Sequence, residues 1–218
     1  CSLIKGFFGF AMADVCPYLA SADMIVGENT CDGKKKAYEI CKQEGIVDNL
    51  YVMDMPQMKS KTGLALLKDE YKKFAVKLEE LSGKTITLES LKKGIEVVNN
   101  KRKALQRLAD LRAADPAPIS GLDALLVNQV SFYDDPIRFT DSVSKICDEV
   151  ESRIKDQNGV FEKGTRRILM SGCPMAVPNW KVPMIIETGG AAIVGEESCV
   201  GERGFQFLVE DKGESVDQ

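Results

Sequence analysis

The sequence contains no histidine and only one tryptophan. Histidine is the commonest general base near neutral pH and the commonest nitrogen ligand of metals. Any catalysis must therefore depend on carboxylates, lysines, hydroxyls, thiolates or a bound metal. Long apolar runs are missing too, since no stretch has the roughly 20 apolar residues that a membrane-spanning helix needs. We therefore expect no membrane partner.

A strong excess of either charge is also missing. The 29 basic and 33 acidic residues give a formal net charge of -4, which provides no reason to expect nucleic acid as a partner. With 218 residues, of which 44% are hydrophobic, the chain is long enough for one large α/β domain or parts of two.

Both ends of the chain look cut, because residue 1 is a cysteine that structured-looking sequence follows at once. A mature lipoprotein also begins with cysteine, but it usually continues with a polar tether, whereas Leu3, Ile4 and Phe7 follow here. A secretory signal peptide does not fit residues 1–20, because a basic leader is missing and Asp14 interrupts the apolar stretch.

Seven cysteines are a high count for a chain with long helical patterns. Disulfide-rich secreted scaffolds are small and loop-rich, so the composition favours a reducing cytoplasm. There the cysteines would be metal ligands, reactive thiols or small buried hydrophobic residues. No C-x-x-C motif is present, which argues against a structural zinc site.

The hydrophobic pattern predicts an incomplete α/β domain, a helical insert and the start of a second α/β domain. Residues 23–27 and 50–53 are expected to be strands with a helix over 34–43 between them, which is one parallel βαβ unit. Amphipathic helices dominate the middle of the chain. A second unit follows, with strands over 168–170 and 191–195 and a helix over 181–188. The predicted boundaries are 1–57, 58–160 and 161–218.

Three cysteines come directly after predicted strands, where doubly wound sheets bind their ligands: Cys31, Cys173 and Cys199. Cys31 also opens a helix, whose N-terminus favours a thiolate. Cys16 and Cys1 lie 15 and 30 residues before Cys31, in a segment that could fold back onto the same tip. Two half-sites facing one another across a domain cleft are the natural interpretation, with thiolates suited to iron–sulfur clusters or zinc.

A single cysteine near a strand end is more often a small buried residue than a ligand. This interpretation stays open for each of the three alone, but all three have Gly, Asp or Ser beside them rather than apolar neighbours. Cys41 and Cys147 lie within helical patterns, and we expect both to be buried in the core.

Four segments carry a resemblance to a known family: CSLIKGFFGFAMADVCPY, ADMIVGENTCDGKKKAYE, ILMSGCP and GGAAIVGEESCVGERG. They resemble the D-component family of 2-hydroxyacyl-CoA dehydratases, and most closely its double-cubane cluster proteins. The resemblance covers essentially the whole chain. It implies two Rossmann-like parallel-sheet domains, both incomplete here, that hold an oxygen-sensitive iron–sulfur cluster of the 4Fe-4S or double-cubane 8Fe-9S type.

The resemblance also implies the ligands and the partners. Cys1, Cys31 and Cys16 would be ligands from the first domain, and Cys173 and Cys199 from the second. An ATP-hydrolysing iron–sulfur activator would supply low-potential electrons to a homo- or heterodimer that acts on an acyl-CoA or another small molecule. The family carries a further cysteine beyond the ESCVG motif, which would lie past residue 218. Its contacts to substrate would lie before residue 1. No catalytic residue is predicted.

Other motifs leave alternatives open. Lys34, Lys35 and Lys36 crowd a helix N-terminus, where they could balance an anionic cluster, meet a CoA phosphate, dock the ATPase or form a solvated face. Glu196 and Glu197 beside Cys199 could be an acid/base pair, although a structural role in the turn is favoured.

Two classes of function remain. The first is an enzyme component, either a double-cubane reductase or an (R)-2-hydroxyacyl-CoA dehydratase subunit with one 4Fe-4S cluster. The five visible ligand candidates favour the double-cubane type. The second is a cluster-free or zinc-bearing interaction module that keeps only the fold.

Overall fold

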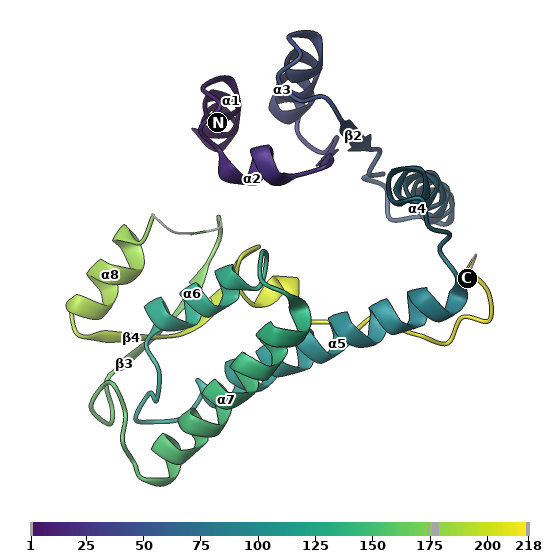
Figure 1. Ribbon diagram of the computed structural model, residues 1–218. Coiled ribbons are helices and arrows are strands. Elements are labelled where there is room, and N and C mark those ends of the chain that lie inside the picture. The colour runs from purple at the N-terminus through teal and green to yellow at the C-terminus, as the bar shows by residue number, and fades with distance from the viewer. Residues whose placement is uncertain (1, 174, 176–178, 217–218) are drawn as a thin grey trace. The chain divides into compact units, whose positions relative to one another are not determined.

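The computed structural model describes residues 2–173, 175 and 179–216. These residues form two compact units that divide between Ile86 and Thr87, within the segment predicted as a helical insert. Each unit contains one pair of parallel strands together with helices, as Figure 1 shows. The chain therefore has the mixed α/β architecture that the sequence predicts.

The first unit contains the predicted βαβ arrangement. Strands β1 and β2 pair in parallel from Ile25 opposite Leu50 to Glu28 opposite Met53. The chain passes between them through a helix, as parallel strands require. The elements in chain order are α1 (Ser2–Met12), α2 (Pro17–Ser21), β1 (Ile25–Glu28), α3 (Asp32–Gln43), β2 (Leu50–Met53) and α4 (Lys61–Ser82).

Helix α3 packs between β1 and α1. Tyr38 of α3 lies over Gly27 so closely that a Cβ at that position would come within 2.5 Å of the ring, so only glycine fits there. On its other side, the Tyr38 ring meets Phe7 of α1 edge-on, with 6.0 Å between centroids. Ile4 lies against Gly33 at the start of α3. Helices α1 and α3 therefore begin near the same end of the strands.

Helix α4 is bounded by capping residues and held against β2 by one aromatic side chain. The Ser60 hydroxyl accepts a 3.1 Å hydrogen bond from the Gly63 amide, and Gly83 ends the helix in the left-handed conformation, with φ of 65°. Tyr51 of β2 lies 5.2 Å from the ring of Phe74 in α4.

The second unit is larger, and its strands β3 and β4 also pair in parallel. The pairing shifts by one residue after Ile168, so that Leu169 lies opposite Gly195 and Val194 is bulged. The elements in chain order are α5 (Leu88–Leu111), α6 (Gly121–Val130), α7 (Pro136–Lys155), β3 (Arg166–Ser171), α8 (Lys181–Thr188), β4 (Ala191–Glu197) and the 3₁₀ turn η1 (Glu202–Gly204).

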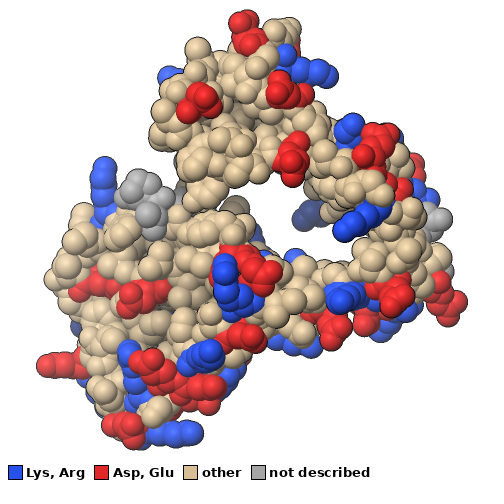
Figure 2. All heavy atoms as spheres, in the orientation of Figure 1, with Lys and Arg blue, Asp and Glu red and all other residues tan. Residues whose placement is uncertain are grey.

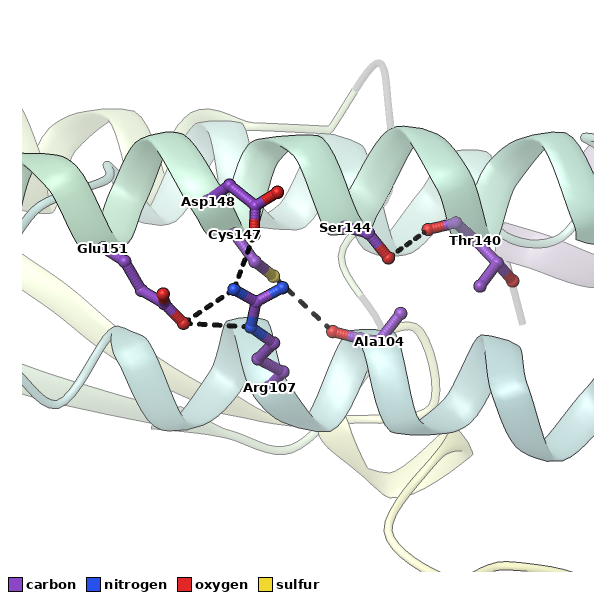
Figure 3. Close-up of polar contacts among 7 residues, drawn as sticks. All are labelled: Ala104, Arg107, Thr140, Ser144, Cys147, Asp148 and Glu151. Atoms are coloured by element: carbon purple, nitrogen blue, oxygen red, sulfur yellow. Dashed lines mark hydrogen bonds and ion pairs between the residues drawn. The ribbon is translucent and has the colours of Figure 1, made fainter.

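The main hydrophobic core of this unit lies between α5 and α7, which run side by side (Figure 1). Leu108 and Val143 are almost completely buried within it. At its edge, Arg107 of α5 lies between two acidic residues of α7, Asp148 at 2.7 Å and Glu151 at 2.7 Å (Figure 3). The core consists of Ala104, Leu105, Leu108, Ile119, Phe139, Val143, Cys147, Val150 and Phe205.

Polar side chains tie the sheet to the surrounding helices. The guanidinium of Arg167 in β3 donates to the carbonyl oxygens of Ala114 and Ala113, just after α5, at 2.8 and 2.9 Å. The carboxylate of Glu187 in α8 accepts a 2.7 Å hydrogen bond from the amide of Gly121, the first residue of α6. An acidic group is favoured there, because the helix N-terminus carries free amides and the positive end of the dipole.

Residues 115–118, predicted as a linker or sharp turn, form a turn whose last three residues are buried. Charges of both signs are interspersed over the face shown in Figure 2. Among the residues that the structure describes, we find no helix with the length and apolar character needed to cross a membrane.

Candidate functional site

Cys31 lies directly beyond the carboxyl end of β1, as the sequence predicts. It is the N-cap residue of α3, with an extended backbone, and its half-buried thiol makes no capping hydrogen bond. The helix N-terminus favours an anionic group at this position. The thiol lies beside Gly33, 3.7 Å from where a Cβ on that residue would be.

The loop that carries Cys31 is held by the carboxylate of Glu28, the last residue of β1. One oxygen of Glu28 accepts hydrogen bonds from the amide of Thr30, at 2.7 Å, and from its hydroxyl. The other oxygen binds the ammonium of Lys34 on α3. The Lys34 bond, followed by the Thr30 hydroxyl, lowers the pKa of Glu28 to about 2. The ionised carboxylate of Glu28 therefore joins the end of β1 to the following loop and to α3.

The three lysines at the start of α3 all form ion pairs within the first unit. Their acidic partners belong to the same helix or to the preceding strand, so much of their charge is already balanced. This arrangement favours a local structural role over a free basic patch. The pairs are Lys34 with Glu28, Lys35 with Asp32 at 2.8 Å, and Lys36 with Glu39 at 3.0 Å.

Cys16 lies elsewhere in the first unit. It precedes α2 and lines a cavity of about 330 Å³ together with Ile25 and Asn49. Ile25 is the first residue of β1, and Asn49 immediately precedes β2, so this cavity lies at the amino ends of the strands. Cys31 follows the carboxyl end of β1. The structure therefore does not bring Cys16 to the tip at which Cys31 lies.

In the second unit, both candidate cysteines follow strands. Cys173 is exposed two residues after β3, and Gly172 before it has φ of 133°, a conformation that L-residues rarely adopt. The amide of Gly172 donates to the carbonyl oxygen of Glu197 at 3.2 Å, so the chain after β3 stays bound to the end of β4. Cys199 is exposed two residues after β4.

Glu197, the last residue of β4, organises the surface of this strand end. One carboxylate oxygen accepts a 2.7 Å hydrogen bond from the hydroxyl of Ser171 at the end of β3. The other binds the guanidinium of Arg203, whose Nε donates at 2.7 Å. These two bonds, that of Ser171 first, lower the pKa of Glu197. A second nitrogen of Arg203, Nη1, donates to the Cys199 sulfur at 3.8 Å.

Glu196 faces the interior instead and stabilises the turn over residues 198–201. Its carboxyl group accepts a 2.9 Å hydrogen bond from the Ser198 hydroxyl, which in turn accepts one from the Gly201 amide at 3.1 Å. Burial raises the pKa of Glu196. The structure thus gives Glu196 and Glu197 different partners, in keeping with the structural role that the sequence favoured over an acid/base pair.

The two cysteines expected in the core are there. Cys41 and Cys147 have no exposed surface, and burial raises the pKa of both thiols. The Cys147 thiol points toward the carbonyl oxygen of Ala104, 3.8 Å away (Figure 3). Neither residue is accessible to a metal without rearrangement of the core.

Cys1 lies outside the described residues, so its place in the site stays a prediction. Within the described part of the chain, no three His, Cys, Asp or Glu side chains come together in a way that could hold a metal ion. A cleft shared by Cys31, Cys173 and Cys199 stays a prediction as well.

Sequence reasoning missed the residues that hold the two cysteine loops, above all Lys34 as the partner of Glu28 and Arg203 as the partner of Glu197. A signal for them exists. In each unit a glutamate ends the strand before the cysteine, and a basic residue follows that glutamate six positions later. A hydroxyl group, from Thr30 or Ser171, binds the same carboxylate in each case.

Comparison with known proteins shows the family of the chain. A family model described as "2-hydroxyglutaryl-CoA dehydratase, D-component" matches residues 1–218. The chain belongs to this dehydratase D-component family.

Two relatives illustrate the membership. The chain is 34% identical over 224 residues to YjiM of Escherichia coli (strain K12), which is named as a dehydratase subunit; the match covers all of this chain and 56% of YjiM. It is 27% identical over 202 residues to the (R)-phenyllactyl-CoA dehydratase beta subunit of Clostridium sporogenes, covering 90% of this chain and 52% of that protein. The chain thus spans about half the length of these two relatives.

Proposed function

We propose that this D-component chain provides the iron–sulfur site of a 2-hydroxyacyl-CoA dehydratase-type system. The observation that carries the proposal is the paired arrangement of strand-end cysteines. Cys31 in one unit, and Cys173 and Cys199 in the other, follow parallel strands, retain accessible thiols and lie in loops fastened by ionised carboxylates. We propose each unit as part of a Rossmann-like domain.

The donor chemistry suits such a cofactor. Thiolates are the ligands that iron–sulfur clusters require, and Cys31, Cys173 and Cys199 are accessible while Cys41 and Cys147 are not. We propose these three, together with Cys1, as ligands. Cys16 fits this role least, because it lies at the opposite end of the β1–β2 sheet.

A bound cluster would supply single electrons at low potential. The chain's own residues do three things in this proposal. The cysteine thiolates hold the iron, Glu28 and Glu197 fix the loops that carry them, and Lys34 and Arg203 place positive charge beside the sulfur atoms. We propose an acyl-CoA with a 2-hydroxyl group as the substrate class, supported by the name of the Clostridium sporogenes relative.

We further propose a multisubunit, ATP-dependent system, with a separate ATP-hydrolysing protein as electron donor. The name of the same relative, a beta subunit, supports an assembly of several chains. Turnover of a 2-hydroxyacyl-CoA by the complete system should stop when either ATP or the donor protein is omitted. Equal turnover without ATP would contradict this part of the proposal.

The deciding experiment measures iron and acid-labile sulfide in the full-length protein that carries this chain, after anaerobic reconstitution. Single variants Cys31→Ser, Cys173→Ser and Cys199→Ser should each lose most of the iron, whereas the matched control Cys147→Ala should keep it. About four or about eight iron atoms per chain would distinguish the 4Fe-4S cluster from the double-cubane type. Full iron content in all three serine variants would refute the proposed ligands.

A further inference from the structure

The contact between Arg203 and Cys199 gives the second unit a feature beyond its ligands. Nη1 of Arg203 donates to the Cys199 sulfur across 3.8 Å, within the distance of a hydrogen bond to sulfur. Both side chains are accessible, since Cys199 is exposed and half of the Arg203 side-chain surface is open to solvent. A positively charged donor therefore lies beside this thiol at the surface.

The orientation of Arg203 is set by its other contacts. Its Nε donates to Oε1 of Glu197 at 2.7 Å, and its Nη2 binds the same oxygen. These two bonds hold the planar guanidinium by one edge, which leaves Nη1 directed at Cys199. The second oxygen of Glu197 is held by Ser171. The guanidinium of Arg203 is thus held in place by residues at the ends of both β3 and β4.

The first unit repeats the arrangement with other residue types. The carboxylate of Glu28 binds the Thr30 hydroxyl and, six residues further on, the ammonium of Lys34. Lys34 lies in the first turn of α3, three residues after Cys31, which is the N-cap residue of that helix. Each unit therefore holds a cation near its cysteine through a strand-end carboxylate.

We propose that Arg203 is a positioning residue that donates a charge-assisted hydrogen bond to the Cys199 thiolate and thereby raises the reduction potential of the cluster bound there. Glu197 is the residue that aims it. This inference rests on the proposed function. Hydrogen bonds to ligand sulfur and nearby positive charge stabilise the extra electron of the reduced cluster, so their removal makes reduction harder.

The first test measures the midpoint potential of the reconstituted full-length protein in wild type, Arg203→Gln and Arg203→Lys. At a constant solution potential, the ratio of reduced to oxidised cluster in Arg203→Gln should fall about tenfold. This is equivalent to a midpoint potential lower by about 59 mV for one electron. Lysine keeps the charge and should restore part of the loss. Glu197→Gln should act in the same direction, because it frees the guanidinium. Arg138→Gln, which removes an exposed arginine of α7 that pairs with Asp134 just before that helix, is the control and should not change the ratio.

The second test uses the cluster-free protein and so separates this inference from the proposed function. The rates at which iodoacetamide alkylates Cys199 and Cys173 are followed by mass spectrometry, with Cys173 as the internal standard. Arg203→Gln should change the alkylation rate of Cys199 at least threefold, because it removes the side chain that donates to that sulfur, and should leave the rate at Cys173 unchanged.

The outcomes are distinguishable. A protein that takes up no iron while Arg203→Gln still changes the alkylation rate of Cys199 would refute the proposed function and support the contact between Arg203 and Cys199. An unchanged alkylation rate at Cys199 would overturn the inference. So would an unchanged midpoint potential in an Arg203→Gln protein with full iron content.

Discussion

The hydroxyl of Tyr51 in β2 donates a 2.7 Å hydrogen bond to the buried carboxylate of Glu70 in α4. The same carboxylate forms an ion pair with Lys73 at 3.5 Å. Desolvation, followed by the bond to Glu70, raises the pKa of Tyr51 to about 12. Glu70 as a residue is only 5% exposed, so the Tyr51 hydroxyl replaces part of the hydrogen bonding to water that its carboxylate has lost.

Replacement of Tyr51 by phenylalanine should destabilise the protein by about 1–2 kcal/mol, because the buried carboxylate of Glu70 loses one of its partners while the ring packing against Phe74 is kept. Urea denaturation at neutral pH would measure the loss. Tyr71→Phe removes the same atom from an exposed ring on α4 and should cost less than about 0.5 kcal/mol. Equal effects of the two substitutions would contradict the importance of the buried bond.

Glu28 should make stability depend on pH in the acid range. Its pKa falls from the ordinary 4.5 to about 2 in the folded protein. The stability that this carboxylate contributes is therefore present above pH 4.5 and is lost as pH falls toward 2. The difference in unfolding free energy between wild type and Glu28→Gln should narrow between pH 6 and pH 3 in urea titrations.

The control for Glu28 is Glu80→Gln. Glu80 pairs with Lys77 on the exposed side of α4, at 3.1 Å. Such a pair contributes only a few tenths of a kcal/mol, so this variant should stay close to wild type throughout the range. A constant gap between Glu28→Gln and wild type from pH 6 to pH 3 would show that the Lys34 and Thr30 contacts do not stabilise the fold.

Two glycine-to-alanine substitutions should have effects of opposite sign. A Cβ on Gly201 would lie 2.1 Å from the carbonyl oxygen of Glu196, so the turn after Cys199 must shift, and we expect a loss of at least about 1 kcal/mol. A Cβ on Gly94 within α5 meets nothing within 4 Å, so alanine should stabilise that helix by about 0.5–1 kcal/mol. Thermal unfolding of both variants tests the pair, and stabilisation by Gly201→Ala would argue against the turn as described.

The α5–α7 core should respond to truncation in proportion to burial. Leu108 is 2% exposed, and its replacement by alanine should cost about 2–5 kcal/mol through lost contacts and a cavity. Leu91 lies on the same helix but is 39% exposed, so Leu91→Ala should cost less than about 1 kcal/mol. Guanidinium denaturation gives both values; similar losses would mean that the two leucines share a similar environment in solution.

Much of the secondary structure can be predicted from the sequence, because the spacing of hydrophobic residues along the chain differs between helices and strands. The strand predicted over 50–53 and the helix predicted over 181–188 both occur with those bounds. The burial of Cys41 and Cys147 follows from the same periodicity, since each lies on the apolar face of an amphipathic helix. Residues 115–118 read as a linker because prolines mark turns, but proline content does not reveal whether a turn is buried.

The candidate site was less predictable, for a physical reason. Sequence order shows that Cys16 precedes β1, but it does not show at which end of the sheet the intervening turn leaves it. The partners of Glu197 depend on side chains from β3 and from the chain after β4, and thus on how the strands pair. Such tertiary pairing has no local hydrophobic signature. The repeated spacing of six between glutamate and basic residue gives a partial signal for future sequences.

The bulge at Val194 has a consequence for the last two residues of β4. With uninterrupted pairing, Ser171 would lie opposite Glu196, whereas the shifted register places it opposite Glu197. Because side chains alternate between the two faces of a strand, one additional residue exchanges the faces of all the residues that follow it. The bulge thus directs Glu196 to the interior and Glu197 to the surface, although the two side chains are chemically identical. Deletion of Val194 should therefore interchange the surroundings of these two carboxylates while every letter of the ESCVG motif stays the same.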